Sequence, residues 1–177
     1  MVRIIAGIYR SRQLQQPPLS LTRATKDRVR EAVFAALGPK VIGAKVLDLF
    51  AGSGAYGIEA ISRGAIQLHL NDIHEEAIQV IQANLASLKL QGQVVTQLDA
   101  LKFFESFQET YDLIFLDPPY QWSSVEDLLK LVLKSLNPFG VVVYESESEQ
   151  SLLNQDIFRI KTYNYGRTYV HIGWKLT

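Results

Sequence analysis

KVLDLFAGSGAYGIEAISRG, residues 45–64, opens with a short apolar run that ends at Phe50. A glycine-rich turn follows, and the apolar residues after it recur at helical spacing until Gly64, a residue type common just beyond a helix end. The order strand, turn, helix is the repeating unit of a parallel sheet whose faces are covered by helices. The stretch therefore predicts one βα unit that the flanking sequence should repeat.

The same alternation continues on the carboxyl side of this unit. We expect further strands at residues 66–72, 93–99, 112–117 and 140–146. We expect helices between these strands at residues 75–88, 100–107 and 124–136. The strands are apolar along most of their length, which is typical of parallel strands buried on both faces. Residues 158–166 and 168–176 then meet at Gly166 without a helix and predict an antiparallel hairpin. The predicted fold is α/β, doubly wound and Rossmann-like.

A small extension precedes the sheet. Residues 3–9 and 12–15 predict a β-hairpin, and residues 25–38 predict a helix with one apolar face. A chain of 177 residues with 47% hydrophobic content suits one substantial core. We therefore expect residues 1–40 to form an appendage on a main domain of residues 41–177.

Composition excludes several classes of protein. The chain has no cysteine, so disulfides, thiolate metal sites and thiol catalysis are excluded. No apolar run approaches the roughly 18 residues that a membrane-spanning helix needs, and the N-terminus lacks the apolar core of a signal peptide. His69, His74 and His171 show no metal-binding spacing, so no metal is assigned. We expect a cytoplasmic protein without membrane association.

The net charge of zero conceals a basic N-terminal segment. Residues 1–30 hold seven Lys and Arg residues against Asp27 alone, a net charge of +6, which leaves −6 for the rest of the chain. Such a segment is either a solvated charged face or a set of phosphate contacts on nucleic acid. The residues alone leave both interpretations open.

Acids mark the carboxyl ends of four predicted strands, namely Asp48, Asp72, Asp99 and Asp117. In doubly wound sheets this edge holds the ligand, near the point where the strand order reverses. GSGAYG, residues 52–57, satisfies the spacing G-x-G-x-x-G, in which Gly52 and Gly54 let the backbone approach a nucleotide. Asp72 is placed to accept hydrogen bonds from ribose hydroxyls. The pattern predicts a nucleotide-like cofactor, either a dinucleotide or S-adenosylmethionine.

Two features favour S-adenosylmethionine. Asp48 lies four residues before Gly52, where its carboxylate can face the cationic amino acid moiety of that cofactor and would repel a pyrophosphate. DPPY, residues 117–120, is similar to the motif of class I methyltransferases that act on planar amino groups.

The chemistry of such a transfer explains the residue types in DPPY. An exocyclic base amine is a poor nucleophile because its lone pair is delocalised into the ring, so it must be oriented. The Asp117 side chain and the Pro118 carbonyl can accept its two N–H bonds, and Pro118 and Pro119 keep these acceptors rigid. Tyr120 is expected to stack on a base flipped into the site.

Six stretches together resemble the RsmD-type methyltransferases: RIIAGIYRSRQL, TRATKDRVREAVF, DLFAGSGAYGIEAISRGA, NDIHEEAIQVIQANL, DPPY and YESE. The resemblance spans nearly the whole chain and implies a class I methyltransferase fold with a seven-stranded sheet. It implies methyl transfer from S-adenosylmethionine to the N2 amino group of a guanine in 16S ribosomal RNA, the family's target being guanine 966. It also implies that Asp99 and the backbone of Ala100 hold the adenine. Where the family usually reads Arg-Pro-Thr, this chain has Arg23-Ala24-Thr25.

The resemblance further implies that the basic extension helps to hold RNA. We expect the phosphate contacts to come from Arg3, Arg10, Arg12, Arg23 and Arg28. The partner is then ribosomal RNA or the assembling small ribosomal subunit, and we expect a monomer. An adenine-N6 methyltransferase of DNA or RNA and a protein glutamine methyltransferase stay open, because both present a planar amine to a motif like DPPY. A nicotinamide-dependent oxidoreductase and an inert nucleotide-binding module are the alternatives without methyl transfer.

Overall fold

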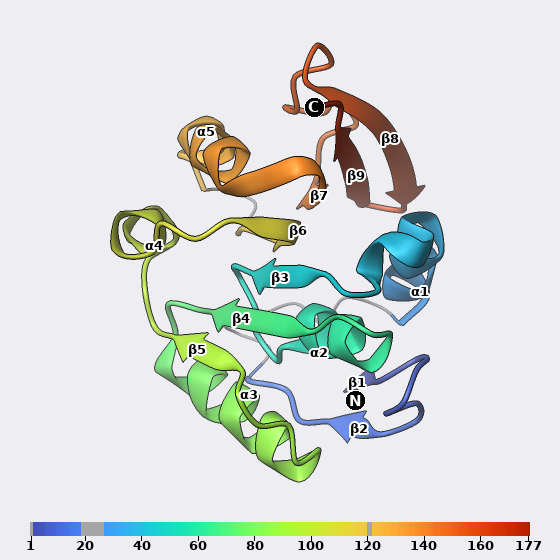
Figure 1. Cartoon of the computed structure of the whole chain (residues 1–177), viewed down its shortest axis with the longest axis vertical. Coiled ribbons are helices and arrows are strands. Elements are labelled where there is room, and N and C mark those ends of the chain that lie inside the picture. The colour runs from blue at the N-terminus through green and yellow to red at the C-terminus, as the bar shows by residue number, and fades with distance from the viewer. Residues whose placement is uncertain (1, 19–26, 120–121) are drawn as a thin grey trace.

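The computed structural model describes residues 2–18, 27–119 and 122–177 (Figure 1). The strands are β1 (Val2–Arg3), β2 (Gln13–Leu14), β3 (Lys45–Asp48), β4 (Gln67–Asn71), β5 (Val94–Thr96), β6 (Tyr111–Leu116), β7 (Leu136–Ser146), β8 (Phe158–Tyr165) and β9 (Thr168–Lys175). The helices are α1 (Asp27–Leu37), the 3-10 helix η1 (Gly38–Val41), α2 (Ala55–Ser62), α3 (Glu75–Ser87), α4 (Ala100–Ser106) and α5 (Val125–Ser135). Each predicted α-helix is therefore present, with bounds close to those expected.

Seven strands form one sheet in the order β5-β4-β3-β6-β7-β9-β8. β3 pairs in parallel with β4 and β6, and β7 continues the parallel order, whereas β9 runs antiparallel to both β7 and β8. The chain builds the sheet from β3 outward to β5 and then returns to the other side of β3 with β6. The strand order thus reverses between β3 and β6, beyond whose carboxyl ends a ligand site is expected. This topology confirms the predicted doubly wound fold and its C-terminal antiparallel hairpin.

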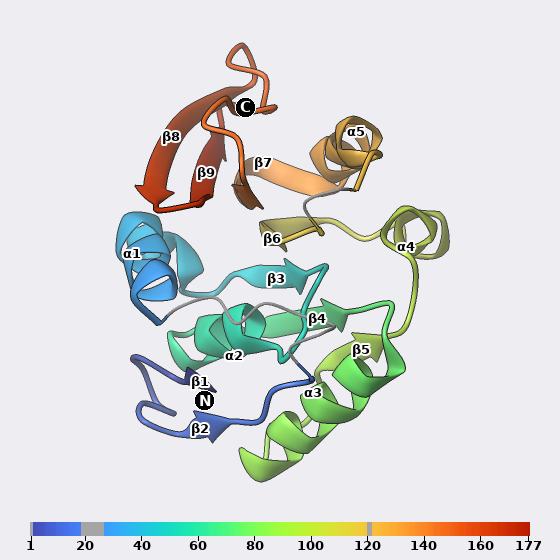
Figure 2. The ribbon, with the colours of Figure 1, turned by 180° about the vertical axis from the view of Figure 1, so that it is seen from behind.

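Helices cover both faces of the sheet (Figures 1 and 2). The face that carries Val46 and Leu113 packs against α1, α2 and α3, and the face that carries Leu47 and Ile114 packs against α4 and α5. Successive strand residues point to opposite faces, so the apolar strands supply both layers. Each fully buried aliphatic side chain contributes about 1.5–3 kcal/mol, which keeps the strand ends in place. No helix within the described ranges is long and apolar enough to cross a membrane.

The N-terminal segment docks on α2 through the buried carboxylate of Glu59. Its two oxygens accept hydrogen bonds from the backbone N–H groups of Ile5, at 2.8 Å, and Ala6, at 3.0 Å. Arg63 donates to the same carboxylate at 2.7 Å, and the fully buried Arg30 of α1 lies 3.7 Å from it. The hairpin and α1 are therefore fixed to the main sheet by buried polar contacts.

β7 begins earlier than the sequence predicts. The predicted strand starts at Gly140, whereas β7 starts at Leu136, directly after α5, because Leu136 is buried and pairs with Tyr111 of β6. Regular pairing resumes only at Val141, so the residues between them form a bulge. This bulge contains Phe139, whose φ is +59° and whose side chain is 61% exposed.

Two buried histidines serve the fold. His69 contacts the hydroxyl groups of Tyr111, at 3.0 Å, and Thr96, at 3.1 Å, and burial lowers its pKa to about 4. His171 contacts the Thr162 hydroxyl at 2.8 Å, and burial lowers its pKa as well. Both rings are therefore neutral at physiological pH and satisfied by their neighbours.

Candidate active site

The strand ends bring four acidic side chains to one edge of the sheet. Asp48 ends β3, Asp72 directly follows β4, and Asp99 directly precedes α4. Asp117 directly follows β6, on the other side of β3. Both Asp72 and Asp117 act electrostatically to raise the pKa of Asp48, as expected for carboxylates that lie near one another. Asp48, Asp72 and Asp117 therefore gather where the strand order reverses, and Asp99 lies farther along the same edge, beyond β5.

The glycine-rich turn after β3 is tied to β4 by Asp72. Gly52 and Gly54 have φ values of +55° and +79°, a region that residues with a Cβ rarely adopt. The Gly52 N–H donates to one Asp72 oxygen at 2.8 Å, and the His74 N–H donates to the other at 3.0 Å. A carboxylate oxygen has two lone pairs, so Asp72 can also accept from ribose hydroxyls.

Replacing Asp72 by alanine is expected to weaken S-adenosylmethionine binding by about 1.5–3 kcal/mol, the scale of hydrogen bonds to a charged group. The fold should survive, because Asp72 follows the end of a strand. Calorimetric titration of folded protein measures the effect, with Asp156→Ala, at an exposed acid far along the chain, as the matched control. An unchanged affinity in the Asp72 variant would remove this carboxylate from the cofactor site.

Asp48 is buried beneath the same turn. Its Oδ2 accepts a hydrogen bond at 2.9 Å from the N–H of Gly57, in the first turn of α2. Burial raises the pKa of Asp48 to about 7; the Gly57 hydrogen bond opposes this shift, and Asp117 and Asp72 add to it. A cation placed against Asp48 would favour its ionised form. The environment therefore suits a carboxylate that pairs with a cationic ligand.

Replacing Asp48 by asparagine is expected to remove the part of the pH dependence of the free energy of unfolding that comes from the titration of Asp48. The pKa of Asp48 is raised from 3.8 to about 7 on folding, so between these values the folded protein holds a proton that the unfolded chain releases. The free energy of unfolding therefore falls as the pH rises through this window. The free energy of unfolding of the variant minus that of the parent should therefore be larger at about pH 8 than at about pH 4. Urea unfolding at the two pH values measures this difference. A difference that is the same at both pH values would mean that folding does not shift the pKa of Asp48.

Asp99 caps the N-terminus of α4. Its Oδ1 accepts hydrogen bonds from the N–H groups of Leu101, at 2.9 Å, and Lys102, at 3.3 Å. The described residues include no hydrogen-bond partner for its Oδ2. Ala100 occupies the first position of the helix, where the backbone N–H has no partner within the helix. One acceptor and one donor thus stand side by side, as the edge of an adenine ring requires.

The Asp-Pro-Pro segment is held against the loop that follows β3. Asp117 is half-buried, Pro118 is buried and Pro119 is exposed. The Pro119 carbonyl accepts a hydrogen bond at 2.9 Å from the Trp122 N–H, and the Trp122 ring lies edge-on to Phe50 with 5.6 Å between ring centroids. This contact joins the turn after β6 to the end of β3, on the two sides of the strand-order reversal.

Glu145, which the sequence left as either a solvated acid or a residue near the substrate, is buried beside Asp117 and pairs with Tyr56, a partner that the sequence did not predict. The Tyr56 hydroxyl donates to Glu145 at 2.6 Å. Leu116, the last residue of β6, pairs with Tyr144 of β7, so Asp117, which directly follows β6, lies next to Glu145 of β7. Burial raises the pKa of Tyr56, and the charges of Glu145 and Asp117 add to the shift. A glutamate after a run of valines was the available signal, because an acid in such a strand needs a partner.

Asn71 is a second residue that sequence reasoning missed. Its amide nitrogen donates to the carbonyls of Leu49, at 3.2 Å, and Leu98, at 2.9 Å. Its amide oxygen accepts from the Thr96 hydroxyl at 2.8 Å and from the Leu98 N–H at 3.2 Å. One buried side chain therefore joins the ends of β3, β4 and β5 and fixes the loops that carry the cofactor residues.

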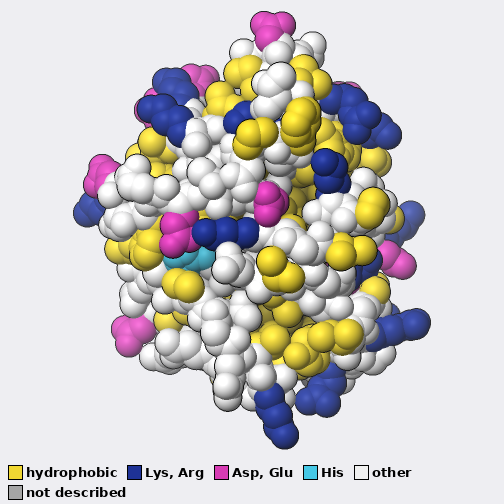
Figure 3. All heavy atoms as spheres, in the orientation of Figure 1, with side chains coloured by type: hydrophobic (Ala, Val, Ile, Leu, Met, Phe, Trp, Pro, Cys, Tyr) yellow, Lys and Arg dark blue, Asp and Glu magenta, His cyan; other side chains and the backbone are white. Residues whose placement is uncertain are grey.

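Four of the five described arginines of the basic segment are exposed, namely Arg3, Arg10, Arg12 and Arg28. Arg3 pairs with Asp27 at 3.2 Å, and exposed pairs of this kind contribute little to stability. Arg30 is one of the seven basic residues counted in this segment, but it is fully buried, so the expectation that all seven contact RNA phosphates is wrong for Arg30. Figure 3 shows Lys and Arg side chains predominating along the right-hand side, over β8, α1 and the N-terminal hairpin of Figure 1.

Arg10 and Arg12 lie at the edge of the sheet opposite the strand-end acids. The Tyr9 N–H donates to the Ser62 hydroxyl at the end of α2, and Arg12 donates to the Ser87 carbonyl at the end of α3. Both helices start at the carboxyl ends of the strands and run back toward the amino ends. An RNA that touches these arginines and the strand-end acids must therefore extend well beyond one base.

Four residues named from the sequence lie outside the described ranges: Tyr120, Arg23, Ala24 and Thr25. The stacking role of Tyr120 and the phosphate contact of Arg23 stay predictions. Within the described ranges, no group of three His, Asp or Glu side chains is placed to hold a metal ion.

Comparison with known proteins gives the chain a family. The model of the family described as Conserved hypothetical protein 95 matches residues 2–174. A relative from Escherichia coli K12, Ribosomal RNA small subunit methyltransferase D, is 36% identical over 153 residues, which cover 85% of this chain and 77% of the relative. A protein of the same name from Haemophilus influenzae is 35% identical over 162 residues, with 88% and 83% coverage.

A solved structure shares the whole architecture. It is described as "Putative methyltransferase yhhF from Escherichia coli", and it superposes on 98% of this chain and 97% of its own with a TM-score of 0.87 and 31% sequence identity.

Proposed function

Because the chain belongs to the family described as Conserved hypothetical protein 95, we propose that it is a methyltransferase that uses S-adenosylmethionine to modify ribosomal RNA. Family membership confirms the resemblance to RsmD-type methyltransferases. The observation that carries the proposal is the meeting of Asp48, Asp72 and Asp117 around a glycine turn at the reversal of strand order.

The polar groups at this edge fit S-adenosylmethionine. Asp48 is a buried carboxylate with a raised pKa, suited to the ammonium group, and Asp72 can accept from the ribose hydroxyls. Asp99 and Ala100 present an acceptor and a backbone donor for the adenine edge. When bound, the cofactor supplies a methyl group made electrophilic by its sulfonium. A pyrophosphate would meet the Asp48 carboxylate unfavourably, which argues against a dinucleotide.

Asp117 and Pro118 orient the target amine. The carboxylate and the Pro118 carbonyl accept its two N–H bonds, which directs the nitrogen lone pair toward the methyl group. The negative charge of Asp117 stabilises the positive charge that develops on the nitrogen, and Asp117 or water then takes the proton that the nitrogen loses. The Pro119 carbonyl accepts a hydrogen bond from the Trp122 N–H, and this contact keeps both acceptors in place.

The finer assignment is the N2 amino group of a guanine in 16S ribosomal RNA, with guanine 966 as the family's target. Relatives named as small-subunit ribosomal RNA methyltransferases support it. An adenine-N6 or a protein glutamine methyltransferase would use the same acceptors at Asp117 and Pro118. The basic side of the molecule favours a nucleic acid substrate over a protein. Residues 1–40 are the proposed RNA-holding extension, and a monomer acting in the cytoplasm stays the expectation.

Replacing both Arg10 and Arg12 by alanine is expected to weaken RNA binding and to make the affinity for RNA less sensitive to salt concentration. Each phosphate contact contributes roughly 0.7–0.9 to the slope of log affinity against log salt concentration, so the slope should flatten by about 1–2. Filter binding of 16S RNA over a salt series measures it, and cofactor affinity should stay at the parental value. A parental slope and affinity would make the segment a solvated face.

Mapping the methylated nucleoside tests the proposed function most directly. Ribosomal RNA or small subunits lacking the modification are incubated with the protein and labelled cofactor, then digested and analysed by mass spectrometry. N2-methylguanosine at one position is the expected product. N6-methyladenosine, or label in protein rather than in RNA, would assign one of the alternative substrates.

A further inference from the structure

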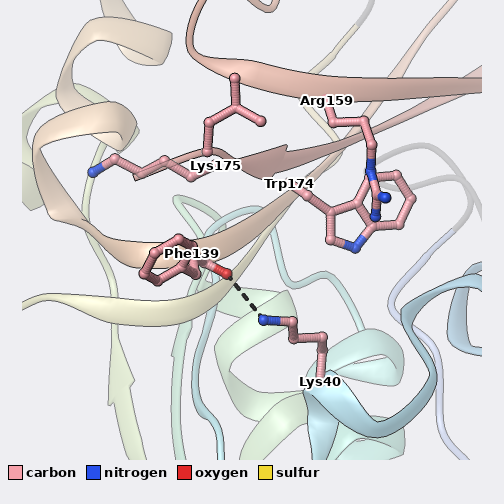
Figure 4. Close-up of a pocket in the computed structure, with 6 residues that line it drawn as sticks. Lys40, Phe139, Arg159, Trp174 and Lys175 are labelled. Carbon is pink, nitrogen blue, oxygen red and sulfur yellow. Dashed lines mark hydrogen bonds between the residues drawn. The ribbon is translucent and has the colours of Figure 1, made fainter.

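A second basic surface lies away from the candidate active site. A hollow of about 250 Å³ is lined by Lys40, Phe139, Arg159, Trp174, Lys175 and Leu176 (Figure 4). Lys40 belongs to η1, which precedes β3, and Phe139 lies near the start of β7. The hollow therefore faces the amino-terminal edge of the parallel strands, whereas the strand-end acids lie at the carboxyl edge.

The lining of this hollow carries three cations and no acid. The Lys40 ammonium donates to the Phe139 carbonyl at 3.4 Å, a long contact that leaves most of its donors for a ligand. The Arg159 guanidinium lies over the Trp174 ring, 5.0 Å from its centroid, and within the described ranges it makes no hydrogen bond or ion pair. Lys175 donates to the Leu136 carbonyl at 2.8 Å. Lys40 and Arg159 are thus the cations placed to receive an anion.

Phe139 is an exposed aromatic residue of the same lining, and its carbonyl contacts Lys40. The β7 bulge holds it at a φ of +59°, an unfavourable backbone conformation for a residue with a Cβ, and its side chain is 61% exposed. Bulges commonly redirect a side chain, and strained backbone is concentrated at functional sites. An exposed aromatic ring beside uncompensated cations is the combination that stacks a base and holds its phosphates.

We propose that this hollow binds a single-stranded segment of the substrate RNA, with one base against Phe139 and the flanking phosphates on Lys40 and Arg159. The proposal rests on the proposed function for RNA as the substrate. The hollow of about 250 Å³ lies just below the roughly 300 Å³ at which pockets for whole small ligands begin, so the proposed occupant is one part of a longer chain. Arg10 and Arg12 lie at the same edge of the sheet, so phosphates can be held at both places by one RNA.

A charge-reversed variant tests the proposal. Lys40→Glu combined with Arg159→Glu is compared with Lys89→Glu combined with Lys130→Glu, which changes the net charge equally at exposed sites outside the hollow. The probe is a single-stranded oligouridylate, titrated over a salt series. The hollow variant should bind at least about tenfold more weakly and with a slope flatter by about 1.4–1.8, the value for two lost phosphate contacts. The control variant should keep the parental slope.

Phe139→Gly tests the stacking face without threatening the fold, because glycine adopts a φ of +59° readily. Its affinity for oligouridylate should fall by about 5–150-fold, the range measured for lost base stacking. In a Trp122→Phe background Trp174 is the remaining tryptophan, and its fluorescence should change when the probe binds. Absence of this signal at saturating probe would place the RNA elsewhere.

The outcomes separate the two proposals. If the parent methylates ribosomal RNA and the hollow variants bind oligouridylate as the parent does, the inference about the hollow is overturned and the proposed function stands. If the parent methylates no RNA but the probe changes Trp174 fluorescence, the proposed function fails and the nucleotide site is supported. If only binding to the assembled subunit is lost, the hollow contacts a ribosomal protein and the inference is overturned.

Discussion

Asp117→Ala should transfer methyl groups roughly 10²–10³ times more slowly than the parent protein, the loss that follows removal of one preorganised charge-stabilising group. Asp117 follows β6 beside the reversal of strand order, where its carboxylate is proposed to orient the target amine. The rigid turn that carries it is held by Pro119 and Trp122, neither of which changes in the variant. The rate should therefore fall while S-adenosylmethionine binds almost as before.

Single-turnover methylation with saturating cofactor measures this loss, and calorimetry measures cofactor affinity in the same preparation. Asp156→Ala, at an exposed acid, should keep the parental rate. Asparagine is a poorer test at position 117, because its amide oxygen can still accept one N–H bond of the target amine. A near-parental rate in the alanine variant would mean that another group orients the amine.

Glu59→Ala should lower the free energy of unfolding by about 3–5 kcal/mol, because it leaves the buried Arg30 without its nearest buried countercharge. The Nε and Nη1 atoms of Arg30 have no hydrogen-bond partner within the described ranges even in the parent. The N–H groups of Ile5 and Ala6 would lose their acceptor as well. For a chain of this size the midpoint of thermal unfolding should fall on the order of 10 °C.

Denaturant unfolding measures the change, with Glu105→Ala, at an exposed position of α4, as the control expected within about 0.5 kcal/mol of the parent. Adding Arg30→Leu to Glu59→Ala should recover part of the loss, since it removes the unpaired charge. A loss below about 1 kcal/mol in the single variant would show that Asp27, 3.0 Å from Arg30, compensates the charge alone.

The fold could be predicted because apolar residues recur at different spacings in its strands and in its helices. Apolar runs such as residues 112–117 and helical patterns such as residues 75–88 alternate regularly, and right-handed crossovers leave few ways to order the strands. Positions of residues at strand ends follow from the same argument, which is why Asp48, Asp72 and Asp117 could be named in advance. Their roles in binding and catalysis stay predictions until the variants are measured.

The polar contacts between distant segments could not be predicted. Glu59 and Arg63 have the spacing of an ordinary surface ion pair on a helix, and nothing nearby in the sequence indicates that the N-terminal segment covers them. Asn71 lies in an apolar strand, where a polar residue usually indicates an exposed position. It is nevertheless only 1% exposed, and its side chain joins the ends of three strands. The hollow around Phe139 depends on the bulge in β7. The length of this bulge is set by how β7 pairs with β6, and the spacing of apolar residues in the sequence does not reveal that pairing.

Glu59 accepts its hydrogen bonds from Ile5 and Ala6 across 54 and 53 residues of sequence. β1 and β2 have two residues each, and an isolated two-stranded hairpin is marginally stable at best in water. As the chain leaves the ribosome, the N–H groups of Ile5 and Ala6 therefore lack their Glu59 acceptor until α2 has been synthesised. The segment made first is therefore fixed only after later residues exist, so the N-terminal extension proposed to hold RNA reaches its final position after the glycine turn that precedes α2 has been made.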